Sequence, residues 1–277
     1  MSGAQAAARQ VLPPVVLLVV LIAAWQGAVT VADIPPFVLP GPAAIASELV
    51  EFRAAIVSAA VVTGGNAALG MLAGGLLGVL LALAAAALRL VDALAAPLVT
   101  AVSVMPVVAL APVLYSMHGA GSEHARVVVA ALAVFVPVYV HTLRGLRQVL
   151  PVHRDLLRAL AATPRQAALL VTLPTALPFV FTGLRLASSL AVISAVVAEY
   201  FGGPRSGIGS FITTAAASSD YAQAWAYVLG AIAVGLLFFT ATSLVERAAV
   251  PAAVPAAVPA VLTTRLHRRR GFTDERR

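Results

Sequence analysis

The sequence predicts an all-α membrane protein, a polytopic bundle of about six transmembrane helices with one long charged loop. Apolar residues make up 61% of the chain and charged residues only 10%, and the mean hydropathy is +0.99, values far from those of soluble domains. Several apolar runs reach the ~20 residues that a helix needs to cross a bilayer. Because an open sheet would leave backbone groups unpaired in lipid, we expect these runs to be helices.

The apolar runs between charged residues place six spans at about 11–33, 60–88, 92–116, 126–143, 176–200 and 221–246. An even number of spans puts both termini on the same side of the membrane. The first run continues without an Ala-x-Ala-type cleavage site, so we expect it to remain as an anchor rather than to be a removed signal peptide.

The arginines set the predicted orientation, because positive charges near the ends of spans stay in the cytoplasm. With both termini inside, Arg53, Arg126 and Arg205 lie outside, and Arg185 lies within a span. Fourteen arginines lie inside: Arg9, Arg89, Arg144, Arg147, Arg154, Arg158, Arg165, Arg247, Arg265, Arg268, Arg269, Arg270, Arg276 and Arg277. We therefore attribute the basic charge to membrane topology rather than to nucleic-acid binding.

Three glycines recur every fourth residue in the second span. Gly70, Gly74 and Gly78 fall on one helix face, where the missing side chains allow another helix to approach closely. We interpret this face as a helix-packing surface, with a role in solute passage as the alternative.

Three prolines interrupt the third span, at positions 97, 106 and 112. A proline removes a backbone donor and kinks the helix, and in membranes such breaks occur where other helices or an aqueous cavity satisfy the freed carbonyl groups. Met105, Pro106 and Pro112 are therefore candidates for a pathway wall or a gate. The alternative is a bent helix with a structural role only.

The charged interval at residues 144–178 carries the signals of two short helices outside the membrane. Prolines are favoured at the first helical position, and a threonine just before it can cap the helix. The predicted limits are Pro151 and about Leu160 for the first helix, and Thr163–Pro164 and Pro174–Pro178 for the second.

The first of these helices has two different faces. Leu156, Leu157 and Leu160 form an apolar edge, whereas Arg154 and Arg158 lie four positions apart on another face. This pattern is typical of a helix that binds in a groove of a partner protein. An amphipathic helix resting on anionic lipid headgroups is the alternative.

The same interval resembles the cytoplasmic loop of the inner-membrane permease subunits of bacterial ABC importers. In that family the loop begins Glu-Ala-Ala, has a glycine after three intervening residues, and ends in Ile-x-Leu-Pro. The matching positions here are Asp155, Leu156, Leu157, Ala161, Val171, Leu173 and Pro174. The match is degenerate at its front and good at its end. Ala161 replaces the glycine, which leaves the sharpness of the bend open, although Ala162, Thr163 and Pro164 still supply a break.

The resemblance extends over residues 11–247 and is closest to the branch that imports nitrate, sulfonates, taurine and thiamine-precursor pyrimidines. Ordered short matches carry it, each weak alone. They are Leu39-Pro40-Gly41-Pro42, the pair Pro106 and Pro112, Gly119-Ala120-Gly121-Ser122-Glu123, Gly145-Leu146-Arg147, Thr182-Gly183-Leu184-Arg185, Val197-Ala198-Glu199 and Gly207-Ile208-Gly209.

This resemblance implies a homodimer assembled with two cytoplasmic ABC ATPase subunits and an extracytoplasmic solute-binding protein, in the inner membrane of a bacterium. The loop at about 151–174 would be a cytoplasmic coupling-helix loop that transmits the motion of the ATPase. The residues implied to be buried in the partner are Leu156, Leu157, Leu160, Ala161 and Ala162. ATP and Mg²⁺ would be used by the partner ATPase, and this chain would bind no cofactor and no metal.

The implied function is that of a permease subunit of an ATP-driven importer, not that of an enzyme. The expected substrate is a small anionic solute such as a sulfonate, taurine or nitrate, with a thiamine-precursor-like pyrimidine as the alternative. A secondary transporter is the rival from another class, but it would need inverted repeats and intramembrane carboxylates, which are almost absent. A chain without lysine also lacks the residue that a phosphate-binding G-x-x-x-x-G-K-[ST] loop requires, so the energy would come from a partner.

Three polar residues near the spans allow two interpretations each. Arg185, inside the fifth span, could attract an anionic substrate, or it could form a structural ion pair or snorkel toward the cytoplasm. Glu199 ends the same span on the outer side, where it could serve gating or binding-protein contact, or could simply be solvated at the interface. His141 is expected to be a hydrogen-bonded core residue rather than a metal ligand.

We place the transmembrane permease domain at residues 1–247 and a Pro/Ala-rich linker with a basic cytoplasmic tail at residues 248–277. Pro251, Pro255 and Pro259 recur every fourth residue, which predicts an extended linker rather than a regular helix. The arginines behind it would bind anionic lipid, or would only reinforce the topology.

Overall fold

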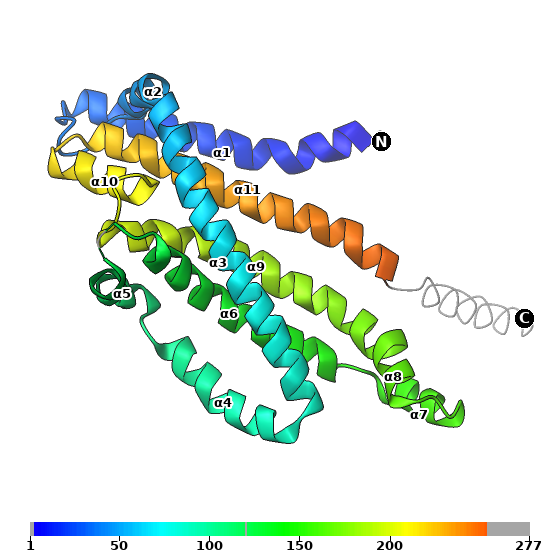
Figure 1. Ribbon diagram of the computed structural model, residues 1–277. Helices are drawn as coiled ribbons and strands as arrows, with labels where there is room; N and C mark the ends of the chain where they lie inside the picture. Colours follow the sequence, from blue (N-terminus) through cyan, green and yellow to red (C-terminus); the bar gives the residue numbers. More distant parts are fainter. Residues whose placement is uncertain (1–2, 120, 254–277) are drawn as a thin grey trace, which may run out of the picture. The chain divides into compact units, whose positions relative to one another are not determined.

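The computed structural model describes residues 3–119 and 121–253, and within them every regular element is a helix (Figure 1). The elements are α1 Gly3–Val31, α2 Pro42–Glu51, α3 Arg53–Ala87, α4 Arg89–Val104, the 3₁₀ turn η1 Val107–Leu110, α5 Ala111–His118, α6 His124–Arg147, α7 Pro151–Ala159, α8 Pro164–Ala167, the π-helical turn η2 Ala168–Thr172, α9 Leu173–Tyr200, α10 Ile208–Ala217 and α11 Tyr221–Ala253. The predicted all-α class is therefore confirmed.

Five helical segments are long and apolar enough to cross a membrane, and a sixth is added if the broken α4–η1–α5 segment counts as one span. The five are Leu12–Val31, Arg53–Ala87, His124–Arg147, Pro164–Tyr200 and Tyr221–Val250. The prediction of about six spans is thus confirmed. Neither α2 nor α10 was predicted, because at 10 residues each they are too short to give a span-length signal.

The third predicted span is not one helix. α4 ends at Val104, Met105 is extended, and Pro106 precedes the short turn η1. The residue before a proline avoids the helical region, so the pair Met105–Pro106 ends α4. Pro112 lies in the first turn of α5, where a missing N–H costs nothing, and Pro97 lies inside α4.

The described chain divides into two compact units. The first contains residues 3–73, 106–119, 121–133 and 189–237, and the second contains residues 74–105, 134–188 and 238–253. α3, α6, α9 and α11 each contribute residues to both units.

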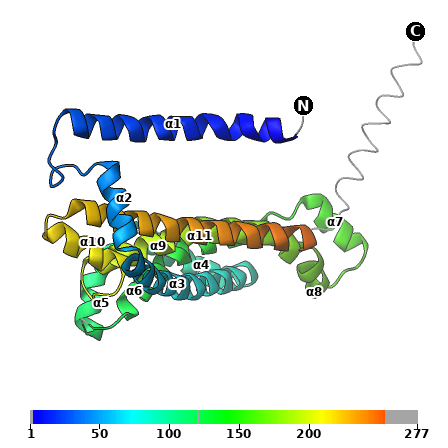
Figure 2. The same ribbon diagram turned by 90° about the horizontal axis from the view of Figure 1, so that it is seen from above.

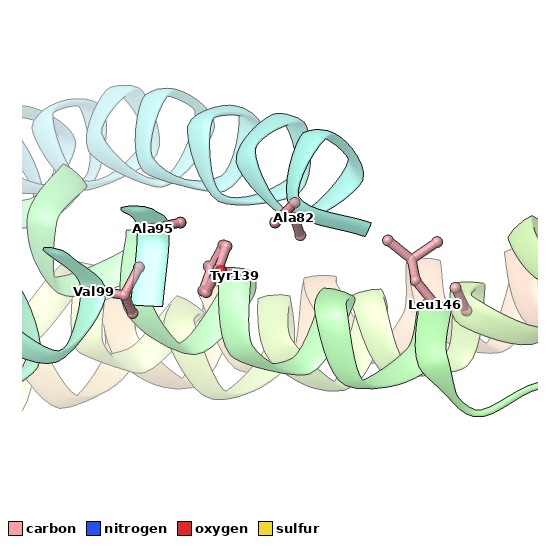
Figure 3. Close-up of a cluster of buried hydrophobic side chains, with 7 residues drawn as sticks. Ala82, Ala95, Val99, Tyr139 and Leu146 are labelled. Atoms are coloured by element: carbon pink, nitrogen blue, oxygen red, sulfur yellow. The ribbon is translucent and has the colours of Figure 1, made fainter. Parts of the chain in front are cut away.

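The second unit has a core of small and aromatic side chains (Figure 3). Ala82, Ala95 and Val99 pack with Tyr139 and Leu146, which come from α6. Alanines lose little side-chain entropy on burial and let the helix backbones approach closely. Dispersion contacts between such closely packed helices hold this unit together.

The glycine face of α3 packs against α6, as predicted. A Cβ atom on Gly70 would lie 2.5 Å from the Cβ of Ala130 in the first unit, and one on Gly78 would lie 2.9 Å from the carbonyl oxygen of Phe135 in the second. Gly74 is buried as well. Gly70 and Gly78 are therefore required by the close approach of the two helices.

The C-terminal boundary needs a correction. α11 continues through Pro251 to Ala253, so an extended linker cannot begin at residue 248. Val250 and the residues before it continue the last span, which sets the end of the helical part beyond Arg247. The rest of the predicted linker and the basic tail lie outside the described residues.

Candidate functional site

The loop at residues 151–174, called the α7 loop here, contains an exposed apolar face. Pro151 occupies the first turn of α7 after an extended Leu150, as predicted. Leu156 and Leu160 are 56% and 68% exposed, whereas Leu157 is half-buried. On the other side of the helix, Arg158 and Asp155 form an exposed ion pair of 3.2 Å. The helix therefore presents leucines that no other described residue covers.

A sharp bend follows α7 even though the family's glycine is missing. Ala161 has a φ of +51°, a left-handed conformation that favours glycine. The N–H of Ala161 donates to the carbonyl of Arg158, and the N–H of Ala162 donates to the carbonyl of Leu157, both at 3.0 Å. These two bonds define a Schellman motif, with Ala161 at the position where glycine is usual. The bend is thus retained at the cost of a strained alanine.

Thr163 caps the next helical segment, as predicted, and it does so through a capping box. Its side chain accepts a hydrogen bond from the backbone N–H of Gln166, and the Gln166 side chain accepts one from the N–H of Thr163 at 2.8 Å. Figures 1 and 2 show α7 and α8 as two short helices joined by this turn. Two local hydrogen-bond motifs therefore fix the loop.

The predicted stop at Pro174 and Pro178 is wrong. Helical structure continues without interruption from Pro164 to Tyr200, because the π-helical turn at residues 168–172 leads directly into α9. A π turn widens the helix just where the ring of Pro174 would clash with the preceding turn. Val171 and Pro174 are half-buried in this stretch, and Leu173 is 38% exposed.

A buried carboxylate lies at the start of α10. Glu199 is 1% exposed, so the interpretation of this residue as interfacial and solvated is wrong. Its oxygens accept hydrogen bonds from the Thr63 hydroxyl at 3.0 Å and from the N–H of Gly209 at 2.7 Å. Thr63 in turn accepts a hydrogen bond from the N–H of Ile208 at 2.9 Å. Glu199 and Thr63 thus satisfy two of the free N–H groups of α10, those of Ile208 and Gly209, at a helix start that has no side-chain cap of its own.

Arg126 balances this carboxylate and is also fully buried, although it was predicted among the outer charges that border a span. Its Nη1 lies 3.8 Å from Oε1 of Glu199, both side chains being 0% exposed. The guanidinium also donates to the carbonyl of Pro204 and, at 3.3 Å, to the Ser206 hydroxyl. Tyr115 accepts from Arg126 Nε at 3.4 Å and donates to the carbonyl of Ala198. We call this set, Thr63, Tyr115, Arg126 and Glu199, the Glu199 network.

The glycines of the Gly207-Ile208-Gly209 motif are explained by this network. A Cβ on Gly207 would overlap the Glu199 carboxylate, and one on Gly209 would overlap the carbonyl of Val196. Neither glycine has a positive φ, so the requirement is for space and not for backbone freedom.

The other predicted residues are dispersed. Arg185 forms an ion pair of 3.0 Å with Glu246, which agrees with the structural ion pair considered for it from the sequence. Nδ1 of His141 lies 2.8 Å from the carbonyl oxygen of Pro137. Met105 is 41% exposed, and the prolines at positions 106 and 112 are exposed as well. Among the described residues, no cluster of three or more His, Asp or Glu side chains could hold a metal ion.

Sequence reasoning missed Thr63, considered Tyr115 only as a residue that could face the pathway, and treated Arg126 only as an outer charge. One signal was present in the sequence, namely that Arg126 begins the fourth predicted span where Glu199 ends the fifth. Opposite charges at the same membrane level on antiparallel spans can pair, and this pairing would have favoured burial over solvation.

Comparison with known proteins agrees with this architecture. The chain is similar to the formylaminopyrimidine transport permease protein ThiX of Halalkalibacterium halodurans, with 29% identity over 87% of this chain and 96% of the relative. It is 30% identical to the putative aliphatic sulfonates transport permease protein SsuC of Bacillus subtilis, over 82% of this chain and 83% of the relative. Both relatives are named as transport permeases and not as enzymes.

A solved structure titled as an amino acid ABC transporter with histidines has the same fold, with a TM-score of 0.61 at 17% identity over 72% of this chain and 95% of the other. The family model described as "Binding-protein-dependent transport system inner membrane component" matches residues 74–255, which include the α7 loop and most of the spans. The chain therefore belongs to this family of inner-membrane permease components of binding-protein-dependent transport systems.

Proposed function

We propose that this chain is the pathway-forming permease subunit of an ATP-driven importer for a small anionic solute such as a sulfonate, taurine or nitrate. The observation that carries the proposal is the exposed apolar face of α7, a helix that is followed by two local hydrogen-bond motifs, the Schellman bend and the Thr163 capping box. The relative named for aliphatic sulfonates supports an anionic solute. The similarity to a formylaminopyrimidine permease favours a pyrimidine as the second candidate.

In this proposal α7 transmits force from a separate ATPase, which would use ATP and Mg²⁺. Leu156 and Leu160 would enter an apolar cleft of the ATPase, and burying both would contribute about 2–4 kcal/mol to the contact. Arg154 and Arg158 would fix its register against acidic residues at the rim. Beyond the bend, the uninterrupted helix from Pro164 to Tyr200 would carry the displacement into the bundle.

The complete importer would contain two copies of this chain, two cytoplasmic ATPase subunits and an extracytoplasmic solute-binding protein. The arginine excess supports an orientation with both termini and the α7 loop in the cytoplasm. Exposed leucines on α3, including Leu72 and Leu76 at 70% and 61%, are available for contact with lipid or with the second copy.

The coupling role is tested with Leu156→Asp in proteoliposomes that contain the ATPase and the binding protein. Leu156 is exposed, so the variant should insert and fold normally, yet a buried carboxylate in the partner's cleft should abolish ATPase binding and solute uptake. Leu88→Asp is the matched control, because Leu88 is 57% exposed in the connection between α3 and α4. Uptake and stimulated ATP hydrolysis at wild-type rates in Leu156→Asp would show that α7 is not the coupling element.

The substrate class is tested by uptake of labelled taurine, ethanesulfonate, nitrate and a formylaminopyrimidine with the complete transporter. Uptake of an anion that the pyrimidine does not inhibit is the expected result. Uptake of the pyrimidine alone would replace the anion proposal by the second candidate.

A further inference from the structure

A solvent-open cavity of about 400 Å³ lies beside α10. The end of α9, the glycine turn after it and one face of α10 form its walls. A volume in this range accommodates a small solute together with some water. The polar side chains that line it include Arg205, Ser210, Thr213, Thr214 and Ser218.

The face of α10 that lines the cavity carries four hydroxyl groups, at positions 210, 213, 214 and 218, and we call it the hydroxyl face. This spacing places them on one side of a helix. Each hydroxyl donates its proton to a carbonyl of its own helix turn, at distances of 2.7, 2.9, 2.8 and 3.2 Å in chain order. Because their protons are used in this way, the oxygens offer acceptor positions, which suit an N–H donor such as an ammonium group.

Arg205 gives the same cavity a positive charge. Its side chain is exposed and forms no ion pair or hydrogen bond with any other described residue. Glu199 does not neutralise it, because that carboxylate is already bound by Arg126, Thr63 and the α10 backbone. A guanidinium without a partner is suited to bind a sulfonate or a carboxylate through two parallel hydrogen bonds.

We propose that this cavity is a contact site for a short zwitterionic solute, with its acidic group on Arg205 and its ammonium group on the hydroxyl face of α10. The site rests on the proposed import function and narrows its solute to one that carries an acidic group and an ammonium group, an aminosulfonate or amino acid, rather than nitrate or an uncharged pyrimidine. Thr63, Arg126 and Glu199 are positioning residues, because they hold the first turn of α10 and thereby the hydroxyl face in place.

The absence of cysteine from the chain allows a direct test by site-specific alkylation. Ala217→Cys places a thiol in the cavity lining without removing any of the four hydroxyls. The full-length variant in nanodiscs is alkylated with neutral N-ethylmaleimide, with and without about 20 mM taurine, which would saturate a site with a Kd of about 1 mM and slow alkylation by about an order of magnitude. Ethanesulfonate and ethanolamine, each with only one of the two charged groups, should protect much less.

Matched variants make the assignment specific. Arg205→Gln in the Ala217→Cys background should abolish the protection by taurine, whereas Arg53→Gln, which removes another exposed arginine from outside the cavity, should retain it. Ser47→Cys, at an exposed position on α2, should react at the same rate with and without taurine.

The outcomes separate this site from the proposed function. If the complete transporter imports taurine but taurine does not protect Ala217→Cys, the site is wrong and the import function stands. If protection persists in Arg205→Gln, or if ethanesulfonate protects as well as taurine does, the zwitterion assignment is overturned. Protection without import of any anion would support the site and overturn the anion import proposal.

Discussion

The Glu199 network and the α7 loop each contain an Arg–carboxylate ion pair. The distance between the charged atoms does not by itself decide which pair contributes more to stability. The pair Arg158–Asp155 is shorter, at 3.2 Å, but both side chains are more than two-thirds exposed. The pair Arg126–Glu199 is longer, at 3.8 Å, and both side chains are 0% exposed. If one partner is removed, water can solvate the remaining charge of the exposed pair, but it cannot reach the remaining charge of the buried pair.

The two regions also differ in which of their groups lack a contact within the chain. At the start of α10, side chains from α3 and α9 bind two of the free N–H groups, and Arg126 balances the carboxylate charge, so these polar contacts are all made within one chain. α7 satisfies its polar groups locally but leaves two leucines exposed. Completed polar contacts indicate an internal support, whereas uncovered apolar surface is available to a partner protein or to lipid.

The largest effect is expected from a substitution that breaks the buried ion pair. Arg126→Met leaves the Glu199 carboxylate buried without its countercharge and should lower the free energy of unfolding by about 3–5 kcal/mol. Unfolding by heat or denaturant in detergent measures it. Arg158→Met is the matched change in the exposed pair and should cost at most about 1 kcal/mol. Equal effects of the two variants would contradict the contrast between the pairs.

A smaller effect is expected from filling the space against Glu199. Gly207→Ala places a methyl group where the carboxylate lies, so the network must shift, at a cost of about 1–3 kcal/mol. Gly65→Ala is the control, because no atom lies within 4 Å of its added methyl group and an alanine in a helix interior should gain about 0.5–1 kcal/mol. Loss of stability in both variants would point to helix backbone effects rather than to the contact with Glu199.

The smallest effect concerns the bend of the α7 loop. Ala161→Gly removes the strain of a left-handed alanine and should stabilise the loop by about 0.5–1 kcal/mol, after allowance for the more flexible unfolded chain. Slower hydrogen exchange of the amides of residues 161 and 162, which form the Schellman bonds, is the measurement. Ala159→Gly, within the helix, should have the opposite sign. Faster exchange in Ala161→Gly would mean that alanine is not strained at this position.

Features determined by nearby residues could be predicted from the sequence. The spans follow from apolar length, the start of α7 follows from Pro151, and the cap at Thr163 follows from a motif four residues long. Pro174 was misread as a stop because the π turn that accommodates it has no sequence pattern of its own.

The Glu199 network could not be predicted in the same way, since it depends on which helices meet. Arg126 and Glu199 each stand at the end of an apolar run, a position that ordinarily faces water. Only the packing of α3, α6 and α9 decides that they are buried. Gly207 and Gly209 entered the sequence analysis only as part of a family match, and the structure adds that the Glu199 carboxylate and the carbonyl of Val196 lie against them.

The remote capping of α10 has a consequence for biogenesis. Thr63 lies 136 positions before Glu199 and 145 positions before Ile208, and the ribosome makes the chain from the N-terminus. The first turn of α10 therefore remains without its cap until α9 has inserted and docked against α3, which is synthesised much earlier. Maturation of this end of the permease is in this way tied to synthesis of about three quarters of the 277 residues.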